Sequence, residues 1–293
     1  MSKIIDKSEV IYSFNQDNKA VAAVKPDEIF TITTFDCFAG QLQSEDDSIA
    51  EMNWDHINPA TGPVLIEGSE KGDILKVEII SIELDSPAVM IAAPKEGVLG
   101  HLIENPITKI LPIEDNQVIF SDKYKFEIEP MVGVIGVAPD KNLDISTGTP
   151  GEHGGNMDCK LLGPGASVYF KVQTEGAMLA AGDMHALMGD GEIVVCAAEA
   201  GGKIKLKANI IKNKDLPVPF IEKDNLISTV ASAKTLDEAV ELATEKMANY
   251  LVENYDLEMT EAGMIMSLIG DAEICQVVDP LKTARFTIDK SKL

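Results

Sequence analysis

Residues 147–200 decide how this chain is organised, and they read TGTPGEHGGNMDCKLLGPGASVYFKVQTEGAMLAAGDMHALMGDGEIVVCAAEA. Glycines stand beside acidic and imidazole side chains in two clusters, one around His153 and one spanning residues 182–192. Glycine permits tight turns and close approach to a ligand, and carboxylates and imidazoles on such turns suit a divalent metal ion. Apolar runs at 166–172 and 176–181 predict strands that carry both loops to one place.

Short apolar runs, separated by Pro and Gly, continue on both sides of this stretch. Strands this short with turns this frequent are typical of a sandwich or barrel and not of βαβ units. The strands are predicted at residues 30–35, 64–67, 74–84, 118–120, 124–128, 132–137, 203–211, 218–221 and 226–230.

Helical spacing begins only near the C-terminus. Thr235 and Glu238 match a capping box, and apolar residues follow at helical spacing as far as Leu251. A second helix is predicted from Thr260 to Gly270, followed by a strand at 274–278. We therefore predict a β-rich region over residues 1–220 that carries the active site, and an α+β portion over 221–293.

The charge of the chain limits its partners. Lys and Arg total 25 against 48 Asp and Glu, which gives a net charge of −23. Such a surface repels phosphate backbones and anionic lipid, so we expect no nucleic-acid and no membrane partner. The four cysteines lack CxxC spacing, no apolar segment reaches the ~20 residues of a membrane span, and the charged N-terminus is unlike a signal peptide. These features predict a cytoplasmic protein with reduced thiols.

Four blocks of this sequence resemble the acetamidase/formamidase family. They are PGEHGGNMD (150–158), GAMLAAGDMHALMGDGE (176–192), NPATGPVLIEGSEKGDILKVEI (58–79) and DAEICQVVDPLKTARF (271–286). The resemblance implies a jelly-roll-like β-sandwich, hydrolysis of formamide-like or acetamide-like linear amides, and a homo-oligomer. Met188 departs from the family pattern, which usually has glutamine at this position.

Asp183 and His185 are the first candidate metal ligands. On an extended segment their side chains point to the same face, so they can share one ion. Asp36 follows a separate predicted strand and is the expected third ligand. Zinc is favoured by the histidine, while the carboxylates leave calcium or manganese open. The alternative is that Asp183 caps a turn and His185 is a hydrogen-bonded core histidine.

Asp190, Glu192 and Glu199 form a second acidic group. Glu192 and Glu199 are seven residues apart, so on one unbroken strand they would face opposite sides. We assign Glu192 as the general base for a metal-bound water, with Glu199 as the alternative. Asp190 lies in a Gly-Asp-Gly turn, where an aspartate often bonds only backbone amides.

The first glycine cluster supplies the candidate substrate-binding groups. Asn156 and the amides of Gly154 and Gly155 can donate hydrogen bonds to an oxyanion. Asp158 can bind metal or take part in proton transfer, and a plain glycine-rich turn is the alternative. His56 is an additional candidate outside the two clusters.

A covalent mechanism is the less favoured chemistry. Cys37 and Cys159 each follow a candidate aspartate, so alternation on a strand would turn each thiol away if its aspartate points inward. The family resemblance implies an amidohydrolase that acts on a small amide, and the candidate ligands favour metal-activated water as its nucleophile. The alternative is a non-catalytic β-sandwich that binds a metal or a small ligand.

Overall fold

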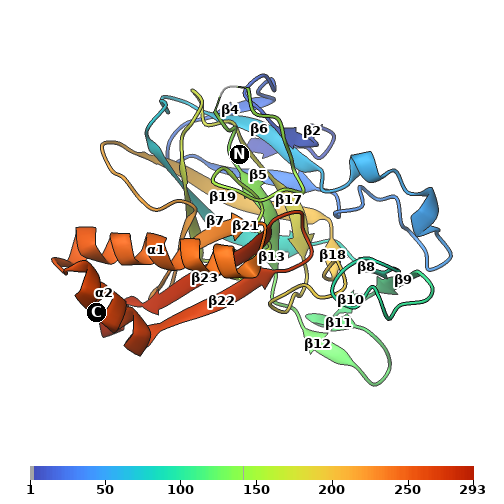
Figure 1. Cartoon of the computed structure of the whole chain (residues 1–293). Coiled ribbons are helices and arrows are strands. Elements are labelled where there is room, and N and C mark those ends of the chain that lie inside the picture. Colours follow the sequence, from blue (N-terminus) through green and yellow to red (C-terminus); the bar gives the residue numbers. More distant parts are fainter. Residues whose placement is uncertain (1–2, 141) are drawn as a thin grey trace.

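The computed structural model describes residues 3–140 and 142–293. In this part of the chain two nine-stranded sheets pack face to face, and two helices lie at one end of the molecule (Figure 1). The prediction of a mainly β fold with helices near the C-terminus is confirmed.

The first sheet joins strands from both ends of the chain. Its strands, in spatial order, are β1 (Lys3–Ile5), β5 (Ile29–Thr34), β19 (Gly202–Ile211), β7 (Ile74–Leu84), β16 (Ser167–Lys171), β20 (Phe220–Lys223), β21 (Leu226–Ala233), β23 (Lys282–Asp289) and β22 (Gly270–Gln276). Strands on both sides of residue 220 therefore share one sheet, and the division of the chain at that residue stays a prediction.

The second sheet carries the candidate site. Its main path is β15 (Gly154–Asn156), β13 (Met131–Gly136), β17 (Leu179–His185), β18 (Glu199–Ala200), β8 (Ala88–Ala92) and β9 (Ile107–Leu111). The strand β6 (Ala60–Ile66) joins it through β17 and also pairs with β2 (Val10–Ile11) and β4 (Ala22–Val24). Two small ladders comprise β10 (Ile113–Glu114), β11 (Gln117–Ile119) and β12 (Lys125–Glu127), and β3 (Ser13–Phe14) with β14 (Ile145–Ser146).

The core lies between the two sheets. Ile32 and Val77 of the first sheet belong to the same buried cluster as Val64, Val132 and Leu179 of the second, and all five are fully buried. Each such side chain contributes about 1.5–3 kcal/mol of apolar burial. This packing fixes β13 and β17, and with them the end of β17 that carries the candidate ligands.

Two helices pack beside the first sheet. The helix α1 (Leu236–Tyr255) begins at the predicted capping box, where Thr235 Oγ1 accepts from the Glu238 amide at 3.2 Å. The helix α2 (Met259–Ile269) begins one residue before the predicted start. Its N-cap is Glu258, and the backbone amide of Glu258 donates to the Glu261 carboxylate at 3.0 Å. The 3₁₀ turns are η1 (Ile49–Glu51), η2 (Trp54–His56) and η3 (Lys290–Lys292).

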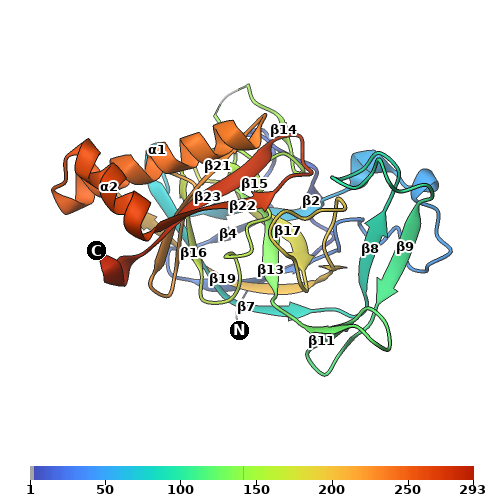
Figure 2. The same ribbon diagram turned by 60° about the horizontal axis from the view of Figure 1, so that its bottom comes forward.

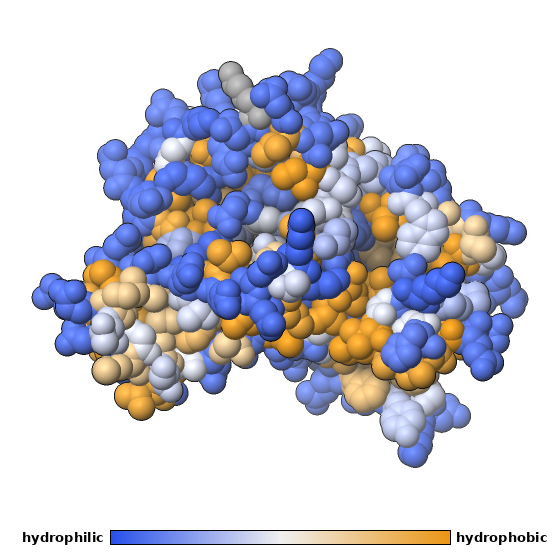
Figure 3. Space-filling view, viewed as in Figure 1, coloured by the Kyte–Doolittle hydropathy of each residue, from blue (hydrophilic) through white to orange (hydrophobic). Residues whose placement is uncertain are grey.

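Figure 3 shows one face of the molecule, which is mostly hydrophilic, with apolar side chains gathered over α2. Met259, Met264 and Leu268 of that helix are 50%, 64% and 83% exposed. Figure 2 shows β8, β9 and β11 at the opposite end of the molecule. Among the described residues, no helix has both the length and the apolar character needed to span a membrane.

Candidate active site and metal centre

Five buried side chains meet around the end of β17, and we call them the acidic centre. His185 lies in the middle: its Nε2 is 3.3 Å from Glu199 Oε2, 3.5 Å from Asp183 Oδ1 and 3.6 Å from Asp158 Oδ1. Glu192 places a carboxylate oxygen within 4.8 Å of ligand atoms of Asp158 and His185, and none of the five side chains is more than 7% exposed. Two strands and two loops therefore bring four carboxylates to one imidazole.

Strand pairing and a glycine position these side chains. The antiparallel register sets His185 of β17 opposite Glu199 of β18. A Cβ on Gly133 of the neighbouring strand β13 would lie 2.4 Å from Asp158 Oδ1 and 2.5 Å from Asp183 Oδ2. The bare backbone at Gly133 therefore leaves the room that the two carboxylates occupy.

Three of the four acids have strained backbones. The φ angles of Asp158, Asp183 and Glu192 are +44°, +54° and +49°. The left-handed region costs an L-residue roughly 1–2 kcal/mol, and such conformations gather at functional sites where the surrounding structure enforces them. Asp183 is thus not regularly extended as assumed from the sequence, yet it still meets His185 as the spacing predicted.

Glu192 and Glu199 both point into the acidic centre. The prediction that they face opposite sides assumed an unbroken strand, but residues 186–198 between β17 and β18 form an irregular segment. Period-two alternation does not apply to such a segment, so the assumption was wrong. The structure therefore brings together both alternatives for the general base.

The loop before Glu192 is anchored to the C-terminal strands. Arg285, which is 1% exposed, donates to both carboxylate oxygens of Asp190 at 2.8 Å, and Lys160 lies 2.9 Å from the same carboxylate. The Gly191 amide adds a hydrogen bond to the Cys275 carbonyl at 2.8 Å. Asp190 is therefore an ion-pair partner and not the simple backbone cap that its Gly-Asp-Gly context indicated.

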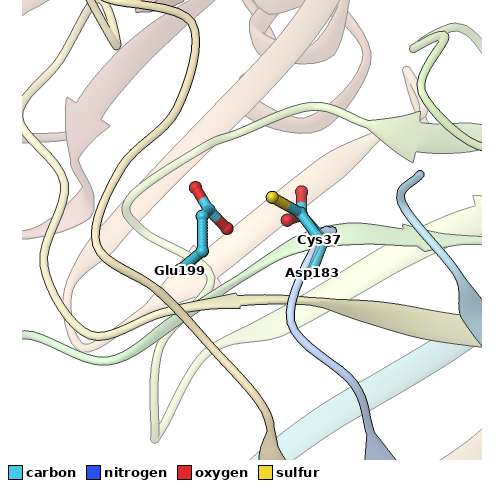
Figure 4. A group of neighbouring side chains, drawn as sticks. All are labelled: Cys37, Asp183 and Glu199. Atoms are coloured by element: carbon cyan, nitrogen blue, oxygen red, sulfur yellow. The ribbon is translucent and has the colours of Figure 1, made fainter. Parts of the chain in front are cut away.

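Cys37, and not Asp36, faces the acidic centre. The Cys37 Sγ and one carboxylate oxygen each of Asp183 and Glu199 lie within 4.8 Å of one another, and the three side chains converge in Figure 4. Asp36 Oδ1 instead accepts from the amides of Phe38 and Gly40 at 2.9 and 3.1 Å. Asp36 lines a surface pocket with Lys7. Asp36 and Cys37 face opposite sides, as alternation predicts, but the Cys37 thiol is turned inward and not the Asp36 carboxylate.

Cys159 lies apart from the candidate ligands. It is fully buried and absent from both ligand groups found among the described residues. A hydrogen bond from Cys275 and the nearby Arg285 lower the pKa of Cys159 to about 7 despite its burial. Its thiol turns away from the centre as alternation predicted, while Asp158 turns toward it.

Asn156 is held by an acid that the sequence interpretation did not single out. The Asn156 Nδ2 donates to Asp279 Oδ2 at 2.9 Å, and the buried Asn156 Oδ1 has no hydrogen-bond partner. Asp279 also lies beside Asp158. Asp279 stands between Val278 and Pro280 on a loop without ligand-like spacing, so only the folded chain indicates its place.

Backbone bonding limits the other donors predicted in the first cluster. The Gly154 amide donates to the Gly151 carbonyl at 3.0 Å, so it is not free for an oxyanion. Gly155 lies in β15 opposite Ile135. Burial lowers the pKa of the neighbouring His153 to about 4, which leaves a neutral imidazole at neutral pH.

Two other residues from the sequence analysis lie outside the ligand set. His56 is exposed and stacks on Tyr12, with ring centroids 4.8 Å apart. Met188 is buried against Met131 and Ala197, and Met131 lies opposite His185 in the sheet. The residue that departs from the family pattern therefore contributes to an apolar wall beside the acidic centre.

The acidic centre has too few internal partners for its charge. Burial raises the pKa of Asp158, Glu192 and Glu199, and the other carboxylates add to the rise. Burial alone would lower the pKa of His185, but the Asp183 and Asp158 carboxylates outweigh it and raise the value. Among the described residues, no Lys or Arg forms an ion pair with these four acids.

Several buried polar atoms of the centre have no hydrogen-bond partner, although such atoms in folded proteins are nearly always paired. They are Asp158 Oδ1 and Oδ2, Asp183 Oδ1, His185 Nδ1 and Nε2, and Glu199 Oε2. Carboxylate oxygens and imidazole nitrogens are the donors that zinc, calcium and manganese accept. The residues present therefore fit a divalent cation.

The sequence of this chain matches a known protein family. The model of the Acetamidase/Formamidase family matches residues 3–148 and 144–279. A formamidase from Methylophilus methylotrophus is 25% identical, and the match covers 68% of this chain and 63% of the relative. The chain thus spans under two thirds of that relative's length.

Solved structures match over nearly the full length. An acetamidase from Bacillus halodurans is 41% identical with a TM-score of 0.96, covering 97% of this chain and 96% of the other. A protein described as a predicted acetamidase/formamidase from Thermoanaerobacter tengcongensis is 45% identical with a TM-score of 0.96, covering 98% and 95%. The chain belongs to the Acetamidase/Formamidase family.

Proposed function

We propose that this chain hydrolyses small linear amides, of the formamide or acetamide type, to ammonia and a carboxylate. The observation that carries the proposal is the buried acidic centre, whose four carboxylates surround His185 and leave metal-ligating atoms unpaired. Membership of a family that contains formamidases and acetamidases supports the reaction class.

The divalent ion, with zinc first and calcium or manganese as alternatives, is assigned to this centre. The predicted ligands Asp183 and His185 belong to it, while Cys37 is better placed than Asp36 for the third ligand. When bound, such an ion polarises a carbonyl and lowers the pKa of a water molecule to about 7.

The proton-transfer roles are assigned to Glu192 and Asp158. Both place a carboxylate oxygen within 4.8 Å of a His185 nitrogen, and both have raised pKa values. A raised pKa suits a carboxylate that must take up a proton near neutral pH. Glu192 would accept the proton of the attacking water, and Asp158 would serve the leaving nitrogen.

The same site suggests a small substrate. Asn156 and Gly155 are the candidate substrate-binding residues, and Asn156 offers an unpaired oxygen beside Asp279. Met131, Met188 and Ala197 pack together as an apolar wall next to His185. A short acyl group fits such closely packed surroundings better than a long one.

Location and assembly are parts of the same proposal. All four cysteines are free and buried, which supports a reducing compartment such as the cytoplasm. The exposed apolar side chains of α2 support a homo-oligomer, because large exposed apolar patches often mark interfaces.

Ammonia release from a panel of formamide, acetamide and longer amides tests the activity, with and without a chelator. We expect turnover of the shortest amides and its loss on chelation. Glu192→Gln should lower turnover ~10²-fold or more, because it removes the proton acceptor.

Glu175→Gln serves as the matched control, since Glu175 is exposed. A metal-loaded parent protein that releases no ammonia from any amide would instead favour a non-catalytic binding protein. Unchanged turnover of Glu192→Gln would reassign the base to Asp158 or Glu199.

A further inference from the structure

The acidic centre and Cys37 divide into two sets of metal-ligating side chains. One set is Cys37, Asp183 and Glu199, and the other is Asp158, His185 and Glu192. Within each set, one ligand atom per residue lies within 4.8 Å of those of the other two, and no residue belongs to both sets. Three protein ligands are the usual complement of a catalytic zinc ion, which keeps a further position open.

Unpaired buried atoms occur in both sets. Asp183 Oδ1 and Glu199 Oε2 lack partners in the first, as do both Asp158 oxygens and both His185 nitrogens in the second. If a cation bound the second set alone, it would occupy His185. The Asp183 and Glu199 oxygens beside His185 would then still have no partner. The two sets therefore need separate partners.

Charge counting also favours two ions over one. The two sets contain four carboxylates and a thiol that is deprotonated when it binds a metal, so with a neutral imidazole the charge is −5. One divalent ion leaves −5 + 2 = −3 in a buried volume, whereas two ions leave −5 + 4 = −1. Buried net charge is strongly unfavourable, so the second ion offsets what the first cannot.

We propose that the centre holds two divalent cations side by side, one on Cys37, Asp183 and Glu199 and one on Asp158, His185 and Glu192. The proposal extends the metal site of the proposed function, on which it rests: Asp158 and Glu192 each bind the ion through one carboxylate oxygen and keep the other for proton transfer. The sets adjoin, because His185 Nε2 lies 3.3 Å from Glu199 Oε2 and 3.5 Å from Asp183 Oδ1. Carboxylates so placed can bridge two ions, as in hydrolases with ions ~3.5–4 Å apart. The sulfur ligand gives the first position a preference for a softer ion such as zinc.

The test uses cobalt(II) as a spectroscopic substitute for zinc in the full chain. Metal-free protein is reloaded with cobalt, and metal per chain is measured by elemental analysis. We expect two equivalents and a thiolate-to-cobalt charge-transfer band. Cys37→Ser should lose the band and one equivalent, while His185→Ala should lose one equivalent and retain the band.

Cys196→Ser is the matched control. Cys196 is also buried, but the Ile91 amide donates to its Sγ at 3.1 Å and it belongs to neither set. This variant should keep both equivalents and the band. Glu199→Gln is a second variant of the first position, to be used should Cys37→Ser not fold, and it should also lose one equivalent.

A parent protein that binds one equivalent, or that lacks the charge-transfer band when fully loaded, overturns the two-ion proposal. Failure of the proposed function has a different signature. Two equivalents and the band without ammonia release would refute amide hydrolysis and support the two-ion centre. Ammonia release by a protein that binds one equivalent would support amide hydrolysis and refute the two-ion centre.

Discussion

The carboxylates that build the acidic centre should destabilise the metal-free protein, and Glu199→Gln measures this cost. Asp183 and Glu199 place carboxylate oxygens within 4.8 Å of each other. Two unit charges at that separation repel by about 3 kcal/mol at an effective dielectric constant of ~20. Proton uptake relieves part of this repulsion, so the metal-free variant should be about 1–3 kcal/mol more stable than the parent.

Glutamine preserves the structural contact of this side chain. Glu199 Oε1 accepts from the Ala197 amide at 2.7 Å, and an amide oxygen accepts the same hydrogen bond. Thermal unfolding in chelator should therefore show a Tm raised by about 2–10 °C. With metal restored the order should reverse, because the variant loses a ligand and with it the stabilisation that binding confers on the folded state.

The pH dependence checks the cause. The pKa of Glu199 is raised by burial and by Asp183, so the folded chain holds a proton that the unfolded chain releases. The contribution of this protonated side chain to the stability of the metal-free parent should be fully present below the unfolded pKa. It should be lost as pH rises through the raised folded pKa. Glu199→Gln should flatten that fall in stability at pH values above the unfolded pKa of a glutamate, with the other acids contributing the remainder.

Glu83→Gln is the control for charge removal, since Glu83 is exposed and pairs with Lys203 at 3.4 Å. Its effect should lie within about 0.5 kcal/mol. A metal-free Glu199→Gln protein that is less stable than the parent, with an unchanged pH slope, would refute the repulsion argument. It would also remove the charge-based reason for a cation at this position.

Three further variants test the supports of the site. Arg285→Met should lower the free energy of unfolding by about 3 kcal/mol, measured in urea, because it leaves Asp190 with Lys160 alone; an unchanged midpoint would mean that this ion pair does not hold the loop. Gly133→Ala should reduce metal content, because its Cβ would lie 2.4 Å from Asp158 Oδ1. The control Gly263→Ala should keep the parent metal content, because no atom lies within 4 Å of the added Cβ. Equal metal content in both variants would contradict the close packing at Gly133. Cys159→Ala should hydrolyse amides at close to the parent rate, and a folded, metal-loaded but inactive variant would favour a thiol nucleophile.

Local patterns in the sequence were sufficient for most elements. The strand Ile74–Leu84 and the capping box at Thr235 appear as predicted, because alternation and capping depend on neighbours close in the chain. Asp183 and His185 also meet as predicted, although the left-handed backbone of Asp183 departs from the extended strand that the prediction assumed. The family blocks likewise predict the mainly β fold that the structure shows.

The tertiary structure alone decided which side chains complete the site. Alternation states that Asp36 and Cys37 face opposite ways, but the packing of the sheets determines that the thiol faces Asp183 and Glu199. Asp279 reaches Asn156 across 123 residues of sequence. Such long-range contacts depend on strand order and on loops with left-handed backbone, which short-range sequence patterns do not encode. The sequence by itself therefore determined most strands, the first helix and the Asp183–His185 pair, while the folded chain determined which further side chains lie beside that pair.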